Sequence, residues 1–112
     1  MHTVVETPRY VMDPERLFTA DERETIIDLV ATDPFCGVLI PGGGGIRKIR
    51  VGLGGRGKRG GARVIYLFGG GDVPVFLLTA FAKNERSDLT AVERMTMAKA
   101  SVAMLASYRR KK

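Results

Sequence analysis

A run of basic side chains between residues 46 and 66 is the part of the sequence best suited to chemistry. It contains seven basic residues and no acidic one. Glycines surround the central three, so the backbone there can approach a phosphate closely while guanidinium and ammonium groups surround the anion. This combination favours contact with phosphate or RNA, because a solvated loop usually mixes acidic residues with basic ones. The seven residues are Arg47, Lys48, Arg50, Arg56, Lys58, Arg59 and Arg63.

The charge of the chain is divided unevenly along its length. Residues 1–45 carry three basic and eight acidic residues, a net charge of −5, whereas residues 46–112 carry fifteen basic and four acidic residues, a net charge of +11. Such an asymmetry indicates a polyanionic partner, with nucleic acid first and an acidic protein second. On composition alone, a basic protein with a solubilising tail is an equally good interpretation.

Residue counts exclude several other kinds of site. The chain has one cysteine, Cys36, and one histidine, His2. These counts exclude an internal disulfide and a cysteine-based zinc site, and they argue against a histidine-centred triad. A lone cysteine suits a reducing compartment, and no apolar run is long enough to span a membrane, so we expect a cytoplasmic protein with no membrane partner. We expect no metal and no cofactor.

The elements that must position the basic residues can be predicted from hydrophobic patterns. At 112 residues the chain predicts a single domain, with a basic tail at 109–112. We expect a strand over 3–11, in which Pro8 favours an edge position or a bulge. A turn and a short helix follow over 13–17, and a longer helix begins at the capping box of Thr19 and Glu22 and ends near Thr32.

The second half of the chain is predicted to be a small sheet followed by a helix. Strands are expected over 46–51, 62–68 and 75–83, and the last two form a hairpin. Because these strands are close in sequence, we expect antiparallel pairing, with the helices on one face of the sheet. Alternation places Arg63 on one face of its strand and Tyr66 on the other.

A second capping box, made by Thr90 and Glu93, predicts a helix that runs to about Tyr108. Apolar residues recur along it with a spacing near 3.6, and its methionines are predicted to fill the core. The apolar positions of this pattern are Val92, Met95, Ala98, Val102 and Leu105.

Five short motifs follow one another along the chain: Ile46–Arg50, Gly55–Arg63, Val64–Tyr66, Phe81–Glu85 and Asp88–Thr90. Taken in this order, they resemble the RelE/ParE toxin superfamily, and its HigB-type branch most closely. The resemblance covers roughly residues 3–108 and implies a small α+β fold related to microbial ribonucleases. In such a fold two N-terminal helices pack on an antiparallel sheet, and a C-terminal helix follows the last strand.

The resemblance implies the toxin of a type II toxin–antitoxin pair, which cleaves mRNA in the ribosomal A site and so stops translation. The 2′-hydroxyl attacks the adjacent phosphate without a metal ion, leaving a 2′,3′-cyclic phosphate and a 5′-hydroxyl. The implied partners are the cognate antitoxin, mRNA on the ribosome with its 16S rRNA, and operator DNA reached through the antitoxin. Two alternatives stay open: a ParE-type poison of DNA gyrase, and a nucleic-acid-binding module without catalysis.

The chemistry of RNA cleavage, together with the resemblance, suggests roles for individual residues. Lys58 is the candidate base, because Arg56 and Arg59 beside it disfavour its charged form. Arg63 and Arg59 are candidate stabilisers of the phosphate charge, because a guanidinium stays protonated and binds phosphate through two hydrogen bonds. Lys83, after the last strand, is a candidate acid or phosphate ligand. The further residues expected to contact RNA are Arg47, Lys48, Arg50, Arg56 and Tyr66, the last by stacking on a base.

Overall fold

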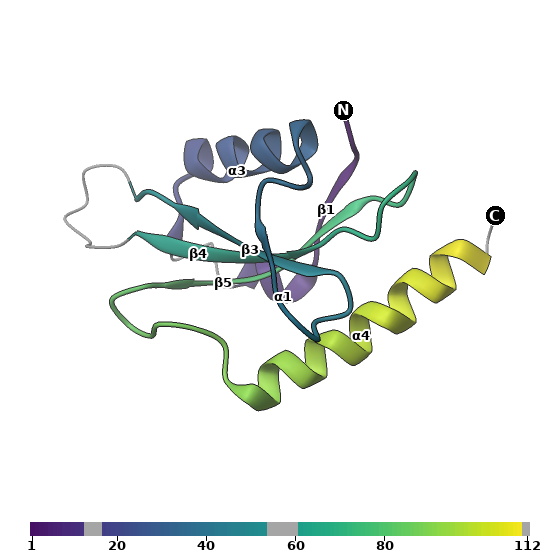
Figure 1. The fold of residues 1–112 in the computed structure, drawn as a ribbon. Helices are drawn as coiled ribbons and strands as arrows, with labels where there is room; N and C mark the ends of the chain where they lie inside the picture. Colours follow the sequence, from purple (N-terminus) through teal and green to yellow (C-terminus); the bar gives the residue numbers. More distant parts are fainter. Residues whose placement is uncertain (13–16, 54–60, 111–112) are drawn as a thin grey trace.

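The computed structural model describes residues 1–12, 17–53 and 61–110. One sheet lies between helix α3 on one side and helix α4 on the other (Figure 1). The elements in chain order are β1 (Val4–Glu6), α1 (Pro8–Met12), α3 (Ala20–Thr32), β2 (Val38–Leu39), β3 (Ile46–Val51), β4 (Ala62–Leu67), β5 (Val75–Ala82) and α4 (Ala91–Arg110). Within the described residues, no helix is both long enough and apolar enough to cross a membrane.

The sheet has the strand order β1-β5-β4-β3-β2 and is antiparallel except for the parallel pair of β1 and β5. The first strand lies at an edge, as predicted, but it ends at Glu6 and not near residue 11. Pro8 instead begins helix α1, where the missing proline N–H costs nothing because the first turn has no partner for it. The short helix predicted over 13–17 falls mostly outside the described residues.

The central strand β4 is buried along its whole length. Ile65 and Leu67 belong to the core beneath α4, whereas Val64 and Tyr66 belong to the core beneath α3, as the alternation predicted. The expectation that both helices cover one face was wrong. A strand that is apolar on both faces needs cover on both, and α3 and α4 provide one layer each.

Both predicted capping boxes are present and fix the starts of the two long helices. The Thr19 hydroxyl accepts from the Glu22 amide at 3.1 Å, and the Glu22 carboxylate accepts from the Thr19 amide at 2.9 Å. Thr90 and Glu93 make the same reciprocal pair at 3.1 and 2.8 Å. Helix α3 ends at Thr32, as predicted. Local sequence therefore determines where these helices begin.

The face that α4 packs against the sheet agrees only in part with the predicted stripe, of which Leu105 is buried. Val92, Met95 and Val102 of the predicted stripe are 72%, 60% and 59% exposed. Apolar residues are spaced by three or four on both sides of this helix, so their period alone does not determine the buried side. The buried residues of α4 are Met97, Ser101 and Leu105.

Glycine turns determine how closely α4 approaches the sheet. Gly44 has a φ of +71°, and a Cβ atom there would lie 2.9 Å from the Ala98 carbonyl oxygen. A Cβ atom at Gly69 would lie 2.6 Å from Leu105. Larger residues at these two positions would push the helix away, so the turns that flank β3 and β4 help to select the face that α4 buries.

Candidate nucleic-acid interface

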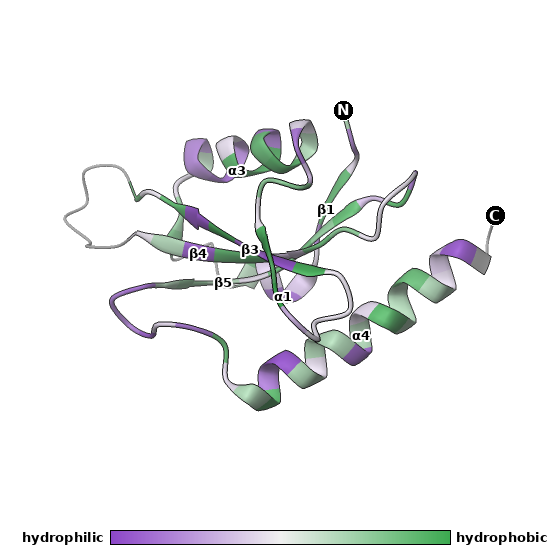
Figure 2. Ribbon diagram, in the orientation of Figure 1, coloured by the Kyte–Doolittle hydropathy of each residue, from purple (hydrophilic) through white to green (hydrophobic). Residues whose placement is uncertain are grey.

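Four basic residues lie near one end of the central strands of the sheet, three of them on its α4 side. Arg50 of β3 lies directly opposite Arg63 of β4, and Arg63 lies opposite Phe81 of β5, which belongs to the core beneath α4. Because side chains alternate along a strand, Lys48 shares the face of Arg50. Lys83 follows β5 directly, and its charge acts on Asp88, the carboxylate that pairs with Lys48. We call Lys48, Arg50, Arg63 and Lys83 the cationic cluster. In Figure 2, hydrophilic and hydrophobic blocks alternate along β3, which supplies two of its members.

The members of the cationic cluster differ in their exposure and partners. Arg50 is exposed and makes no ion pair with any residue in the described ranges. Arg63 is only 8% exposed, and its Nη1 atom donates to the Ala62 carbonyl oxygen at 3.3 Å. Lys83 is half-buried, with its Nζ atom 3.4 Å from the Ser87 carbonyl oxygen. Like charges directly opposite each other weaken a sheet, so the Arg50–Arg63 pair is not explained by stability alone.

One carboxylate, that of Asp88, lies beside the cationic cluster. Its Oδ2 atom is 3.1 Å from the Lys48 Nζ atom, and its Oδ1 atom accepts from the Leu89 amide at 2.8 Å. Partial burial alone would raise the pKa of Asp88, but the Leu89 amide, Lys48 and the charge of Lys83 together hold that pKa below its usual range. Asp88 is therefore ionised at neutral pH. Its motif was noted in the sequence, but the distance of 40 residues from Lys48 hid the ion pair.

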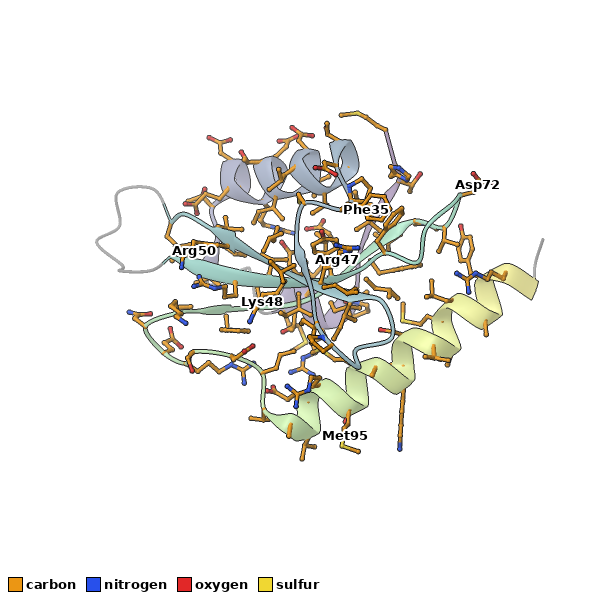
Figure 3. The ribbon with its side chains drawn as sticks, in the orientation of Figure 1. Phe35, Arg47, Lys48, Arg50, Asp72 and Met95 are labelled. Carbon is orange, nitrogen blue, oxygen red and sulfur yellow. The ribbon has the colours of Figure 1, made fainter. Side chains whose placement is uncertain are left out.

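The structure places Arg47 away from the cationic cluster, on the α3 side of the sheet. Its Nη1 atom donates to the Gly37 carbonyl oxygen at 2.8 Å, and its guanidinium lies 5.0 Å from the centre of the Phe35 ring. Figure 3 shows Arg47 beside Phe35, while Lys48 and Arg50 lie elsewhere on β3. Arg47 therefore holds the turn that precedes β2, a structural role that its position in the basic run did not indicate.

Tyr66 lies in the core and has no exposed surface. Its hydroxyl donates to the Pro34 carbonyl oxygen at 2.7 Å and accepts from the Gly37 amide at 2.8 Å. Burial, more than any other cause, raises the pKa of this hydroxyl well above its ordinary value. A ring in this position cannot stack on a base unless the core opens, so we leave Tyr66 out of the RNA-contacting set.

Arg56, Lys58 and Arg59 lie outside the described residues. The segment that contains them connects the ends of β3 and β4, the strands that supply Arg50 and Arg63. Among the described residues, no three histidine, cysteine, aspartate or glutamate side chains gather as a metal ion would require.

Comparison with known proteins identifies the family. The family model for the RelE toxin of the RelE / RelB toxin–antitoxin system matches residues 40–111, well over half of the chain. The chain belongs to the RelE toxin family. The matched residues include the whole cationic cluster and Asp88.

The fold agrees with this assignment. The chain is similar to the solved structure of a mutant of E. coli toxin RelE in the free state, with a TM-score of 0.56 and 19% sequence identity over 90% of this chain and 97% of that one. This similarity confirms the predicted α+β class with its C-terminal helix. The chain is therefore a RelE-family toxin of a toxin–antitoxin system, from a family of endoribonucleases. The HigB-type branch stays a prediction.

Proposed function

We propose that this RelE-family toxin cleaves mRNA on the ribosome by in-line attack of a 2′-hydroxyl, without a metal ion. The observation that carries the proposal is the cationic cluster, in which Arg50 and Arg63 face each other across two central strands. Arg50 is exposed and makes no ion pair with any described residue, and a phosphodiester of RNA is an anion that a guanidinium binds through charge-assisted hydrogen bonds. Family membership supports the choice of RNA over other phosphates.

The cluster suits the charge that develops during cleavage. As the 2′-oxygen bonds to phosphorus, negative charge accumulates on the non-bridging phosphate oxygens. Arg63, buried in the sheet, supplies a guanidinium whose position is fixed before the substrate arrives. Arg50, which is exposed, is placed to capture the phosphate from solution.

The reaction also needs a base and an acid. The base takes the proton of the 2′-hydroxyl as the new O–P bond forms, and the acid gives a proton to the 5′-oxygen as its bond to phosphorus breaks. The products are a 2′,3′-cyclic phosphate and a 5′-hydroxyl. Lys83 lies at the edge of the cluster and is our candidate acid, whereas the candidate base, Lys58, lies outside the described residues.

The proposed partners follow from this activity. The substrate is mRNA held in the A site against the 16S rRNA, which places the toxin in the cytoplasm. The cognate antitoxin would cover the basic surface, and an acidic antitoxin would be captured rapidly by a chain with a net charge of +6. The pair would reach operator DNA through the antitoxin.

Cell-free translation with primer extension tests the proposal. The parent chain should produce cuts that require ribosomes, and Arg50→Gln should reduce the cleavage rate by about 10- to 100-fold, as expected for the loss of a charge-assisted contact to phosphate. Lys99→Gln is the matched control, because Lys99 is an exposed cation on α4 and its loss changes the net charge equally. Equal rates for the two variants would contradict the assigned site.

The same assay discriminates between the alternatives. Intact transcripts together with breaks in gyrase-bound DNA would support a ParE-type poison. Intact transcripts together with intact DNA would support the third interpretation, a nucleic-acid-binding module without catalysis. Cleavage of RNA by the isolated toxin, without ribosomes, that appears with added divalent metal and disappears with a chelator would contradict the ribosome-dependent, metal-free mechanism.

A further inference from the structure

We propose that the pocket between β2, β3 and the start of α4 binds one unpaired RNA base that carries an amino group, and that it disfavours uracil. The inference rests on the proposed function and deepens it by naming a base-binding subsite. The pocket is lined by apolar groups that include Leu39, Pro41 and Leu89, and by the charged side chains of Lys48, Asp88 and Arg94.

The apolar part of the pocket suits the face of a base. Leu39 belongs to the edge strand β2 and is 52% exposed, whereas Leu89 is 9% exposed and forms the inner wall. Every base has a flat apolar face that gains stability when it leaves water and packs against such groups. This part of the pocket therefore gives affinity without distinguishing one base from another.

Asp88 supplies the discrimination. Each of its carboxylate oxygens already accepts one hydrogen bond, from the Leu89 amide at 2.8 Å and from the Lys48 Nζ atom at 3.1 Å. Each oxygen keeps a further lone pair, and a carboxylate can only accept. Cytosine, adenine and guanine present amino groups that donate to it. Uracil presents a single N–H between two carbonyl oxygens, and these oxygens would be repelled by the carboxylate.

Two cations connect the pocket to the phosphate backbone. Lys48 lines the pocket and is also a member of the cationic cluster, so a base in the pocket would hold its own phosphate near the proposed cleavage site. Arg94 also lines the pocket, is exposed, and makes no side-chain hydrogen bond or ion pair with any residue in the described part of the chain. Its guanidinium is available to stack on a base or bind a phosphate.

The charge of the pocket favours RNA over a protein partner. Lys48 and Arg94 outweigh Asp88, which leaves a net charge of +1 that is continuous with the cluster. An inserted basic side chain would be repelled, and an acidic one would face the Asp88 carboxylate. A nucleotide matches both signs, because its phosphate is anionic while an amino-bearing base donates hydrogen bonds.

The first experiment maps cleavage sites across many transcripts in the translation assay. At one position next to the cut, the parent should select against uracil by about tenfold, the discrimination expected for a good hydrogen-bonded base contact. Asp88→Asn should abolish this selection, because an amide also donates and can pair with uracil. Asp28→Asn, an equal change of charge on α3 across the sheet, should retain it. Identical site profiles for both variants would overturn the proposal.

The second experiment measures binding directly and does not depend on cleavage. Cytidine and uridine monophosphates are titrated into the folded chain while backbone amide NMR signals are recorded. Cytidine monophosphate should shift the signals of Leu39, Leu89 and Arg94 at concentrations about tenfold lower than uridine monophosphate. If the parent cleaves no RNA but this difference is found, the proposed function fails and the pocket stands. Equal shifts, or none at these residues, would overturn the pocket.

Discussion

Replacing Tyr66 by phenylalanine separates a structural role from a base-stacking role, because the ring is kept and only the hydroxyl is lost. That hydroxyl bridges the Pro34 carbonyl and the Gly37 amide, two buried groups in the turn between α3 and β2. A base-stacking tyrosine would tolerate the change, since phenylalanine stacks equally well. A structural tyrosine would not, since the turn would lose the two hydrogen bonds that the Tyr66 hydroxyl makes with it.

The magnitude follows from the two bonds that are lost. A buried donor or acceptor that loses its partner costs roughly 1–3 kcal/mol, so the two together should reduce the free energy of unfolding by about 2–6 kcal/mol. For a chain of this length, each kcal/mol lowers Tm by roughly 4 °C, which gives an expected loss of about 8–24 °C. The turn packs closely on the ring, since a Cβ atom placed on Gly37 would lie 2.8 Å from the Tyr66 ring.

The assay pairs thermal unfolding with cleavage by the folded protein. Tyr108→Phe is the matched control, because this tyrosine is 37% exposed on α4 and its ring contact with Phe76, at 6.2 Å between centroids, survives the change. We expect Tyr66→Phe to lose stability while cleavage per folded molecule stays near that of the parent. An unchanged Tm together with a large loss of cleavage would refute this reasoning and return Tyr66 to the RNA-contacting set.

Two further predictions concern helix α4. Met97 is 7% exposed and Met95 is 60% exposed. In denaturant unfolding, Met97→Ala should therefore lower the free energy of unfolding by about 2–5 kcal/mol, and Met95→Ala by less than about 0.5 kcal/mol. A larger loss for Met95→Ala than for Met97→Ala would contradict the observed helix face. Glu93 accepts from Arg86 at 2.8 Å, and chiefly for this reason its pKa falls from 4.5 to about 2. A depressed pKa stabilises the fold above about pH 4.5 and loses that contribution as the pH falls toward 2. Tm measured across this range should therefore fall more steeply in the parent than in Glu93→Gln, and parallel curves would argue against the ion pair.

Short-range patterns predicted much of the fold. The capping boxes at Thr19 and Thr90 were predicted correctly, because a capping box involves residues only three positions apart. The bounds of β3 were also correct, and the alternating faces of β4 followed from the pleat of a strand. The α+β class and the superfamily followed from the order of several motifs, each too weak by itself to identify the family.

The candidate site was only partly predictable. The basic run indicated which strands carry the cationic cluster. It also led to the same prediction, contact with RNA, for Arg47, Lys48 and Arg50. Strand alternation alone places Arg47 on the face of β3 opposite to Lys48 and Arg50. Which of the two faces is free to contact RNA depends on the helix that covers each one. Asp88 and Arg94 contribute to the pocket only because the chain returns beside β3 more than 35 residues later, and a linear sequence does not display that return.

The sequence by itself determined the local elements, the concentration of positive charge after residue 45 and the resemblance to RelE, because each depends on residues that are close along the chain. Only the tertiary structure decided that the sheet is covered on both sides, that Tyr66 holds a turn in the core, and that α4 buries Met97 and exposes Met95. Burial is a property of what packs against a residue from elsewhere in the chain. An apolar or aromatic side chain is compatible with either environment until those distant neighbours are in place.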